Sequence, residues 1–185
     1  MKKIILSMMC LVLTAVGFSQ RTAGGVTFTP KTYMQSHNLV FNGCGLREKY
    51  TIDLYAAALY LTRPSVDANK IIGDDAPMCM EIHIISDRVT RQIFTETVNE
   101  GFQNASHGKA TDAERKQFMG VFKDEFKIGD VIRLEYVPGS GTLAVKNGQW
   151  LGSVPGLEFK KALFSIWLGN KPADSSLKTA LLGKL

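Results

Sequence analysis

Hydrophobic and polar residues alternate in several short segments of this chain. In residues 78–85 a glutamate and a histidine alternate with apolar neighbours, which is typical of a half-buried strand. Residues 50–61 form a longer aromatic and aliphatic run with partial alternation, which predicts a central strand. Further strands are expected at residues 39–41, 44–46, 131–137, 142–146 and 149–151. The Asn147-Gly148 pair between the last two predicts a tight hairpin turn.

Other segments have apolar residues at the spacing of a helix. Residues 89–102 carry such a stripe, which includes Phe94. Thr111 and Glu114 form a capping box that predicts the start of a second helix. Two closing helices are expected at residues 155–168 and 175–182. Strands and helices in this order, with adjacent hairpins, predict an α+β domain in which helices cover one face of an antiparallel sheet.

The N-terminus has the layout of a secretory signal peptide. Two lysines precede an almost uninterrupted apolar run over residues 4–18, which is shorter than the ~20 residues of a membrane-spanning helix. We therefore expect residues 1–19 to be removed and residues 20–185 to form one exported domain, periplasmic or secreted. Residues 20–25 are small or polar and are expected to be a mobile leader before the first strand.

Charge and cysteine content narrow the range of partners. The net charge of +5 falls by two, to +3, when the two lysines of the signal peptide are removed. The basic residues are scattered, so a nucleic-acid partner is not expected. The three histidines lie far apart, and neither a metal site nor a cofactor is expected. Cys44 and Cys79 remain after cleavage. They could form a disulfide or be two buried thiols, and the sequence leaves both alternatives open. The oligomeric state is left open.

Two stretches of the chain carry a family resemblance. The first reads Leu-Val-Phe-Asn-Gly-Cys-Gly-Leu-Arg-Glu-Lys over residues 39–49 and continues as Ile-Asp-Leu-Tyr-Ala-Ala-Ala-Leu-Tyr-Leu over residues 52–61. The second reads Ser-Ile-Trp-Leu-Gly over residues 165–169, with Pro172 and a Leu-Leu-Gly at residues 181–183 after it. In order and spacing these stretches resemble the bacterial chalcone isomerase-like proteins over nearly the whole mature chain. The resemblance implies an open-faced β-sandwich, with a large antiparallel sheet, helices packed on one face and a ligand cleft between them.

The resemblance does not extend to the catalytic residues of plant-type chalcone isomerases. Those enzymes use an arginine, a threonine and a tyrosine that organise a water at the ketone, and an asparagine. Arg47 matches the arginine, but the places of the other three are taken by Tyr55, Phe94 and Gly101. Phe94 has no hydrogen-bond donor. No catalytic residue is therefore assigned, and chalcone isomerisation is not expected.

A second branch of the family binds fatty acids without catalysis, through an arginine and a tyrosine on the next strand. Arg47 and Tyr55 are similar to that pair, and Phe94 would then belong to the ligand wall. A guanidinium offers a planar fork of donors to a carboxylate, and a phenol adds one more. The leading hypothesis is an exported, non-catalytic binder of a small amphipathic or apolar ligand such as a fatty acid.

Two other functions remain open. One is an isomerase or lyase acting on an enone or phenolic substrate, in which Arg47 would stabilise a developing oxyanion and Tyr55 would donate a proton. The other is a structural protein of the cell envelope whose cleft is filled by its own side chains.

The residues singled out also have simpler interpretations. Arg47 could be an exposed strand residue paired with Glu48 or Asp53. Tyr55 and Tyr60 lie five residues apart on a strand, so they should face opposite sides of the sheet, and Tyr60 is expected to be a core residue. The aromatic residues of the helices and the two tryptophans, Trp150 and Trp167, are expected mainly in the core.

Overall fold

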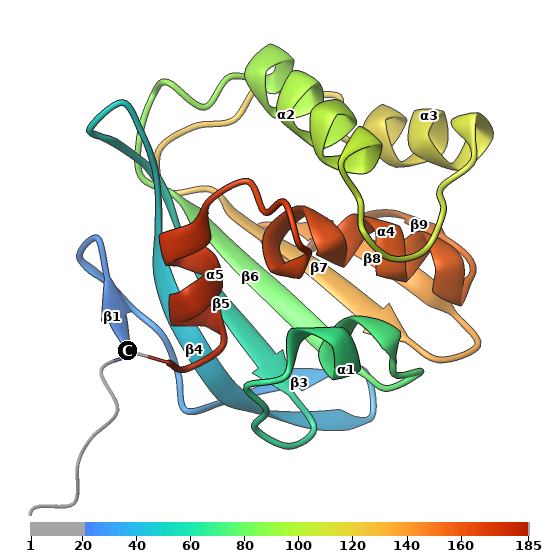
Figure 1. Cartoon of the computed structure of the whole chain (residues 1–185). Helices are drawn as coiled ribbons and strands as arrows, with labels where there is room; N and C mark the ends of the chain where they lie inside the picture. Colours follow the sequence, from blue (N-terminus) through green and yellow to red (C-terminus); the bar gives the residue numbers. More distant parts are fainter. Residues whose placement is uncertain (1–20, 185) are drawn as a thin grey trace, which may run out of the picture.

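Seven strands form one antiparallel sheet in which each strand pairs with the next along the chain (Figure 1). The computed structural model describes residues 21–184, so the predicted signal peptide lies outside the described residues. The strands of the sheet are β3 (Lys31–Met34), β4 (His37–Lys49), β5 (Ile52–Leu61), β6 (Met78–Ile84), β7 (Val131–Val137), β8 (Gly141–Lys146) and β9 (Gln149–Val154). The helices are α1 (Ala68–Gly73), α2 (Arg91–Gln103), α3 (Asp112–Val121), α4 (Leu157–Leu168) and α5 (Ser175–Leu181). None of these helices is long and apolar enough to cross a membrane. The predicted α+β class, with helices packed on a large antiparallel sheet, is confirmed.

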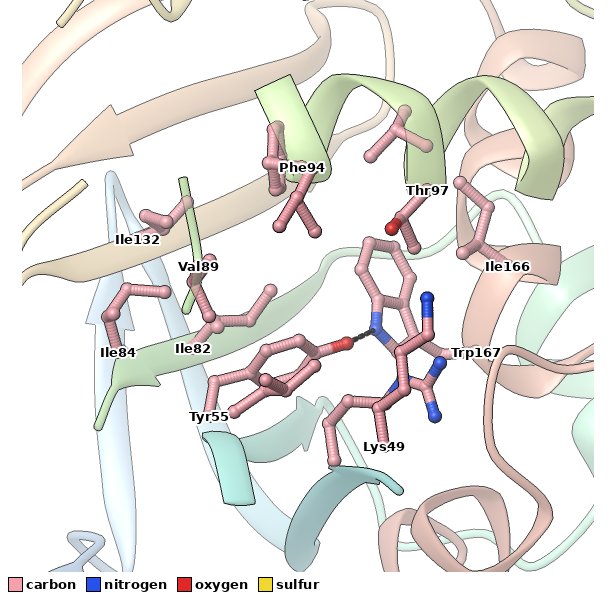
Figure 2. Close-up of a pocket in the computed structure, with 14 residues that line it drawn as sticks. Lys49, Tyr55, Ile82, Ile84, Val89, Phe94, Thr97, Ile132, Ile166 and Trp167 are labelled. Carbon is pink, nitrogen blue, oxygen red and sulfur yellow. Dashed lines mark hydrogen bonds between the residues drawn. The ribbon is translucent and has the colours of Figure 1, made fainter. Parts of the chain in front are cut away.

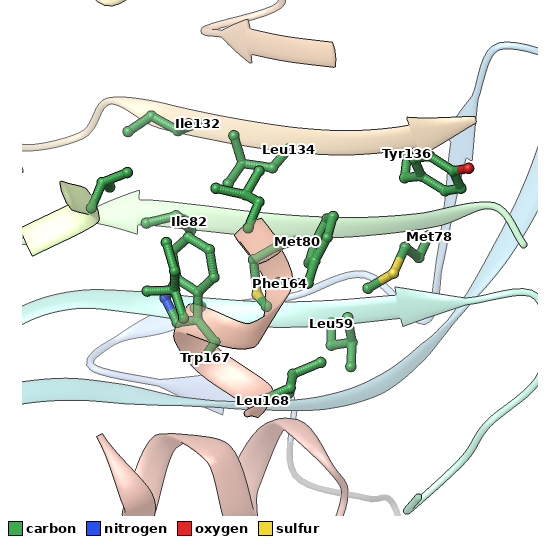
Figure 3. Packing of buried hydrophobic residues seen from close by; sticks show 14 of the residues in the cluster. Leu59, Met78, Met80, Ile82, Ile132, Leu134, Tyr136, Phe164, Trp167 and Leu168 are labelled. Atoms are coloured by element: carbon green, nitrogen blue, oxygen red, sulfur yellow. The ribbon is translucent and has the colours of Figure 1, made fainter. Parts of the chain in front are cut away.

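Helix α4 is the central element of the main core. All residues over 162–168 are buried, so this part of the helix is enclosed on every side by other elements. Phe164, Trp167 and Leu168 lie over Leu59 and Met80 of the sheet (Figure 3). The inner face of the sheet is therefore covered mainly by α4, and α2 and α3 lie beyond one end of it (Figure 1).

The outer face of the sheet carries a second, smaller core. Its largest member is Tyr60, which is fully buried and donates a hydrogen bond of 3.1 Å to the carbonyl of Thr29. Tyr55 belongs to the inner cluster instead. The expectation that the two tyrosines face opposite sides of the sheet, with Tyr60 in the core, is confirmed.

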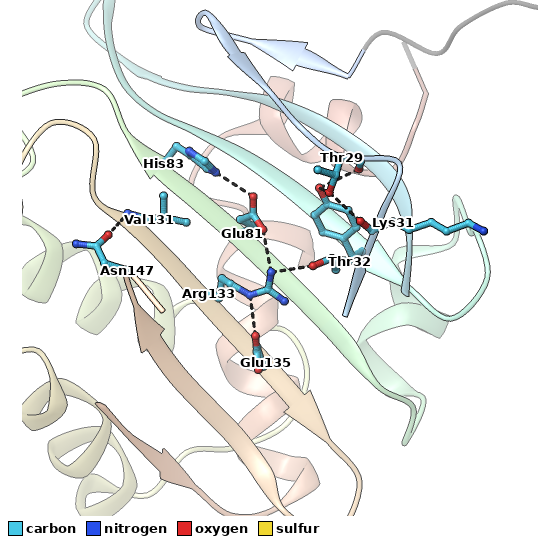
Figure 4. A network of polar contacts seen from close by, with 10 residues as sticks. Thr29, Lys31, Thr32, Glu81, His83, Val131, Arg133, Glu135 and Asn147 are labelled. Atoms are coloured by element: carbon cyan, nitrogen blue, oxygen red, sulfur yellow. Dashed lines mark hydrogen bonds and ion pairs between the residues drawn. The ribbon is translucent and has the colours of Figure 1, made fainter. Parts of the chain in front are cut away.

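An ionic network crosses this outer face (Figure 4). The Arg133 guanidinium donates to carboxylates of Glu81 and Glu135, at 3.1 and 2.7 Å, and to the Thr32 hydroxyl at 2.8 Å. Glu81 also lies 2.9 Å from the His83 ring. Because two carboxylates already neutralise Arg133, this network ties β3, β6 and β7 together rather than offering a site for an anion.

The first described residues pack against the sheet. Thr22–Ala23 (β1) and Val26–Thr27 (β2) pair as a two-stranded hairpin, so the prediction of a mobile leader is wrong. Gly24 forms its turn at φ +54°, and a Cβ there would lie 2.6 Å from the Leu46 side chain. A glycine fits both the left-handed backbone and the close approach to β4, which a run of small residues does not reveal in the sequence.

The two remaining cysteines lie on β4 and β6, which are separated by β5, and do not meet. Cys44 is paired in register with Ala58, whereas Cys79 is paired with Tyr60, and no disulfide joins the two thiols. Burial raises the pKa of both thiols. Of the two alternatives left open by the sequence, the disulfide is wrong, and the prediction of buried thiols holds for Cys79, whereas Cys44 is only half-buried.

Candidate functional site

A cavity lies between the sheet and helices α2 and α4 (Figure 2). Its volume is about 40 Å³, measured as the space open to the centre of a water-sized sphere. The walls consist of Arg47 and Lys49 from β4, Leu54 and Tyr55 from β5, Ile82 and Ile84 from β6, Ile132 from β7, Val89, Ile93, Phe94, Thr97 and Val98 on and before α2, and Ile166 and Trp167 from α4. All three ligand-binding residues predicted from the sequence, Arg47, Tyr55 and Phe94, lie in this wall.

The hairpin between β4 and β5 brings Arg47 and Tyr55 together. Its turn is made by Tyr50 and Thr51, both with positive φ, +51° and +68°. A bulge after Arg47 shifts the register by one residue, so that Arg47 stands directly across from Tyr55. Directly opposed residues of antiparallel strands project on the same side of the sheet. The bulge therefore places the phenol, rather than the neighbouring Leu54, beside the guanidinium.

Arg47 lines the cavity and uses only one of its three guanidinium nitrogens in hydrogen bonds. Its Nη1 atom donates to the Glu48 carbonyl at 2.7 Å and lies 3.4 Å from Oδ2 of Asp174. These are its hydrogen bonds within residues 21–184, and both use Nη1, so Nε and Nη2 remain for another acceptor. The arginine is not the exposed strand residue of the simpler interpretation, because only 15% of its side chain is exposed, and its ion pair is with Asp174 rather than Glu48 or Asp53.

Tyr55 is held by a single hydrogen bond from the neighbouring helix. The Trp167 Nε1 atom donates to the Tyr55 hydroxyl oxygen at 2.9 Å (Figure 2). Burial raises the pKa of Tyr55, and the hydrogen bond from Trp167 and the charge of Arg47 oppose this effect only in part. The phenol is therefore protonated at neutral pH and can donate a hydrogen bond.

The two ends of the cavity differ in polarity. Figure 2 shows Lys49, Tyr55, Thr97 and Trp167 grouped on one side, whereas the opposite side is formed by aliphatic residues such as Ile132. Phe94 closes the cavity from α2, and its ring lies 5.0 Å from that of Phe122 and 4.9 Å from that of Phe126. Phe94 is thus part of the cavity wall and part of an aromatic cluster that joins α2 to the segment around α3.

The sequence profile of the chalcone isomerase-like family matches residues 20–183, and this decides the family. The chain belongs to the chalcone isomerase-like family. A solved structure with a similar fold is that of a fatty-acid binding protein from Arabidopsis thaliana, with a TM-score of 0.69 and 21% sequence identity. The match covers 86% of this chain and 92% of the Arabidopsis chain. No curated protein matches the sequence at a significant level.

Within the chalcone isomerase-like fold, the place expected for a catalytic asparagine has no room for a side chain. A Cβ atom at Gly101 would lie 2.7 Å from Cγ1 of Ile166, so this glycine is where α2 contacts α4 closely. Of the two threonines of α2, Thr95 and Thr97, it is Thr97, one turn after Phe94, that lies in the cavity wall. Thr97 supplies a hydroxyl to the cavity, on the side where Tyr55 and Trp167 also lie.

Three polar wall residues were not predicted from the sequence: Lys49, Thr97 and Trp167. Lys49 lies two residues after Arg47, and Thr97 lies three residues after Phe94, so strand and helix periodicity could have indicated both. Trp167 was assigned to the core, which is correct for its burial but omits its contact with Tyr55. Trp150, also assigned to the core, is 61% exposed on β9, so that assignment is wrong.

Proposed function

We propose that this protein is an exported, non-catalytic binder of a small amphipathic acid, such as a fatty acid. The observation that carries the proposal is the polarity of the cavity, with Arg47 and Tyr55 at one end and an aliphatic wall at the other. The carboxylate would accept hydrogen bonds from Nε and Nη2 of Arg47 and from the Tyr55 hydroxyl, while the alkyl chain lies against Ile84 and Ile132. Charge-assisted hydrogen bonds of this kind are the stronger class.

The protein itself supplies a counter-charge for Arg47. An arginine with 15% of its side chain exposed is costly without a partner, and Asp174 provides one at 3.4 Å. This distance and the use of a single guanidinium nitrogen make a loose pair, so a ligand carboxylate can add to it without displacing it. The pair explains how the same site is stable both with and without an anionic ligand.

The size of the cavity limits how a long ligand can enter. A volume of about 40 Å³ holds roughly three water-sized spheres, which is enough for the first carbons of an alkyl chain. A longer chain must displace part of the wall. Helix α2 is the wall element best suited to move, because among its residues only Val98 and Phe102 are buried, whereas most of α4 is.

The proposal of export depends on the N-terminal pattern of two lysines followed by an apolar run. A secreted or periplasmic protein meets amphipathic acids outside the cytoplasm. Fractionation of cells that express the full chain tests this part, with the mature N-terminus at Gln20 as the expected result.

The enzymatic alternative has weaker support. None of the cavity-lining residues is an aspartate, glutamate, histidine or cysteine, so the described site lacks the usual general bases. Tyr55 and Lys49 are the only titratable groups besides Arg47 in the wall, and the raised pKa of Tyr55 disfavours proton abstraction by its phenolate. Clear turnover of a chalcone by the purified protein would overturn the non-catalytic proposal.

Direct binding measurements test the proposed function. Isothermal titration of the mature protein with saturated acids of six to sixteen carbons is expected to give one site per chain. Each acid should bind at least about tenfold more tightly than its methyl ester, because hydrogen bonds to a charged group contribute about 1.5–3 kcal/mol. Equal binding of acid and ester would exclude the carboxylate anchor, and no binding of either would support the structural alternative with a filled cleft.

We expect Phe94→Leu to favour longer ligands. The smaller side chain leaves more room for an alkyl chain in the cavity wall. The affinity for the sixteen-carbon acid should therefore rise about threefold to tenfold relative to that for the eight-carbon acid, which corresponds to the burial of roughly one or two additional methylene groups. The matched control is Phe118→Leu, which alters a buried phenylalanine of the aromatic cluster outside the cavity wall. An unchanged chain-length preference in Phe94→Leu would contradict the placement of the alkyl chain.

A further inference from the structure

The hydrogen bond between Trp167 and Tyr55 has only one possible direction. An indole N–H is a donor and never an acceptor, so the Tyr55 oxygen accepts this bond. A phenolic proton lies in the plane of its ring and has two positions there. With the indole N–H occupying one side of the oxygen, the proton of Tyr55 is directed to the other side.

The two residues that form this bond are firmly held. Trp167 is 3% exposed and lies on α4, in which nine of the twelve residues are buried. Tyr55 lies in β5, which pairs with β4 on one side and β6 on the other. The orientation of the hydroxyl is therefore set by two rigid elements rather than by a flexible loop.

The neighbouring cations present donors as well. Arg47 and Lys49 carry no acceptor atoms. Both line the cavity beside Tyr55, Arg47 directly across from it on β4 and Lys49 on the side to which the Tyr55 hydroxyl points. Among the described residues of the cavity wall, Thr97 is the one besides Tyr55 whose side-chain hydroxyl can either accept or donate a hydrogen bond. With the Tyr55 oxygen occupied by Trp167, this end of the cavity offers mainly donors, which match a group that has acceptors alone.

We propose that Trp167 is a positioning residue that turns the Tyr55 hydroxyl into a donor toward the ligand and so selects a carboxylate over an alcohol of the same chain length. This inference rests on the proposed function and deepens it by assigning the head-group specificity of the site. An alcohol must place its own proton on an acceptor, and the Tyr55 oxygen could serve only if Trp167 did not occupy it. A carboxylate needs no such acceptor.

The test compares decanoic acid with 1-decanol in titrations of wild type and Trp167→Phe. The variant keeps an aromatic ring but lacks the N–H, so the Tyr55 hydroxyl can rotate and accept from the alcohol. We expect the ratio of the two affinities to fall about tenfold, the size of one hydrogen bond. Trp150→Phe is the matched control, since Trp150 is 61% exposed and lies outside the cavity wall, and it should leave the ratio unchanged.

A second variant, Tyr55→Phe, changes the other partner of the hydrogen bond, which lies on β5. It should lower the ratio by itself, and adding Trp167→Phe to it should lower the ratio no further, because the hydroxyl to be oriented is gone. A purely structural role of Trp167 predicts additive effects instead and would overturn the proposal. An unchanged ratio in Trp167→Phe would also overturn it while leaving the proposed function intact. Failure of wild type to bind decanoic acid would overturn both.

Discussion

Arg47→Ala should weaken the binding of a fatty acid by about 100-fold. The guanidinium is the strongest donor at the polar end, and losing a charge-assisted pair of hydrogen bonds in a largely buried site costs about 2–4 kcal/mol. Titration with decanoic acid measures the change directly. Mass spectrometry of organic extracts gives an independent readout, in which an acid that co-purifies with wild type should be absent from the variant.

Two further variants separate the charge of Arg47 from its shape. Arg47→Lys keeps the charge but loses the planar fork, so its affinity should fall between those of wild type and Arg47→Ala. Arg88→Ala is the matched control, because its side chain is 72% exposed and its nearest carboxylate, that of Asp87, lies 3.9 Å away. Wild-type affinity in Arg47→Ala would show that the carboxylate is held elsewhere, with Lys49 as the next candidate.

The strands with regular alternation were predictable from the sequence. Residues 78–85 and 131–137 correspond closely to β6 and β7, because one face of each packs on the core and the other carries the ionic network. The Asn147-Gly148 turn is confirmed, with φ of +51° and +79° that suit these two residues. The Thr111–Glu114 capping box is also present. In these places a local physical rule decides the structure.

The hairpin that carries the candidate site was harder to predict from the sequence. Its turn residues, Tyr50 and Thr51, include no glycine or asparagine, although both have positive φ. The sequence pattern therefore predicts one continuous strand over residues 50–61, whereas β5 begins at Ile52. The bulge that places Tyr55 across from Arg47 has no sequence signal either, so the pairing of these residues followed from the family resemblance and not from local pattern.

Contacts between segments that are distant in the sequence could not be predicted from local patterns. Trp167 lies 112 residues from Tyr55 along the chain, and a helical pattern identifies it only as buried. Helix α1 was not predicted at all, since it has six residues and buries only Ile71 and Ile72. Helix α1 is stabilised by hydrogen bonds from a lysine on α4, and loss of this interaction is expected to lower the stability of the protein strongly.

Lys160→Met should destabilise the protein by about 3–5 kcal/mol. The side chain of Lys160 is fully buried, and its Nζ donates to the carbonyls of Ile71, Ile72 and Asp74 at 2.8, 2.8 and 2.9 Å. These are carbonyls at the C-terminal end of α1, which have no partner within the helix. Methionine fills the space but leaves them unpaired, and each buried unpaired group costs about 1–3 kcal/mol. Urea unfolding at pH 7 measures the loss.

The adjacent lysine is the matched control. Lys161 pairs only with the exposed Glu158, three residues earlier on the same helix, so Lys161→Met should change stability by less than about 0.5 kcal/mol. If the two variants lose equal stability, the effect comes from changing the helix surface and not from the carbonyls of α1.

The pH dependence of the same pair of variants tests the charge of Lys160. Burial lowers its pKa from 10.5 to about 8, against the opposing effect of Asp74 and Asp75. Between these two values the unfolded chain binds more protons than the folded one, so the lysine's contribution to stability rises with pH across this window. The difference in unfolding free energy between wild type and Lys160→Met should therefore widen by about 2–3 kcal/mol from pH 7.5 to 10.5. Titrating groups that do not contact Lys160, such as Tyr60, are common to both proteins and cancel in the difference. A constant difference would mean that the three carbonyls offset the cost of burying the ammonium, and that Lys160 is charged in the folded protein throughout this range.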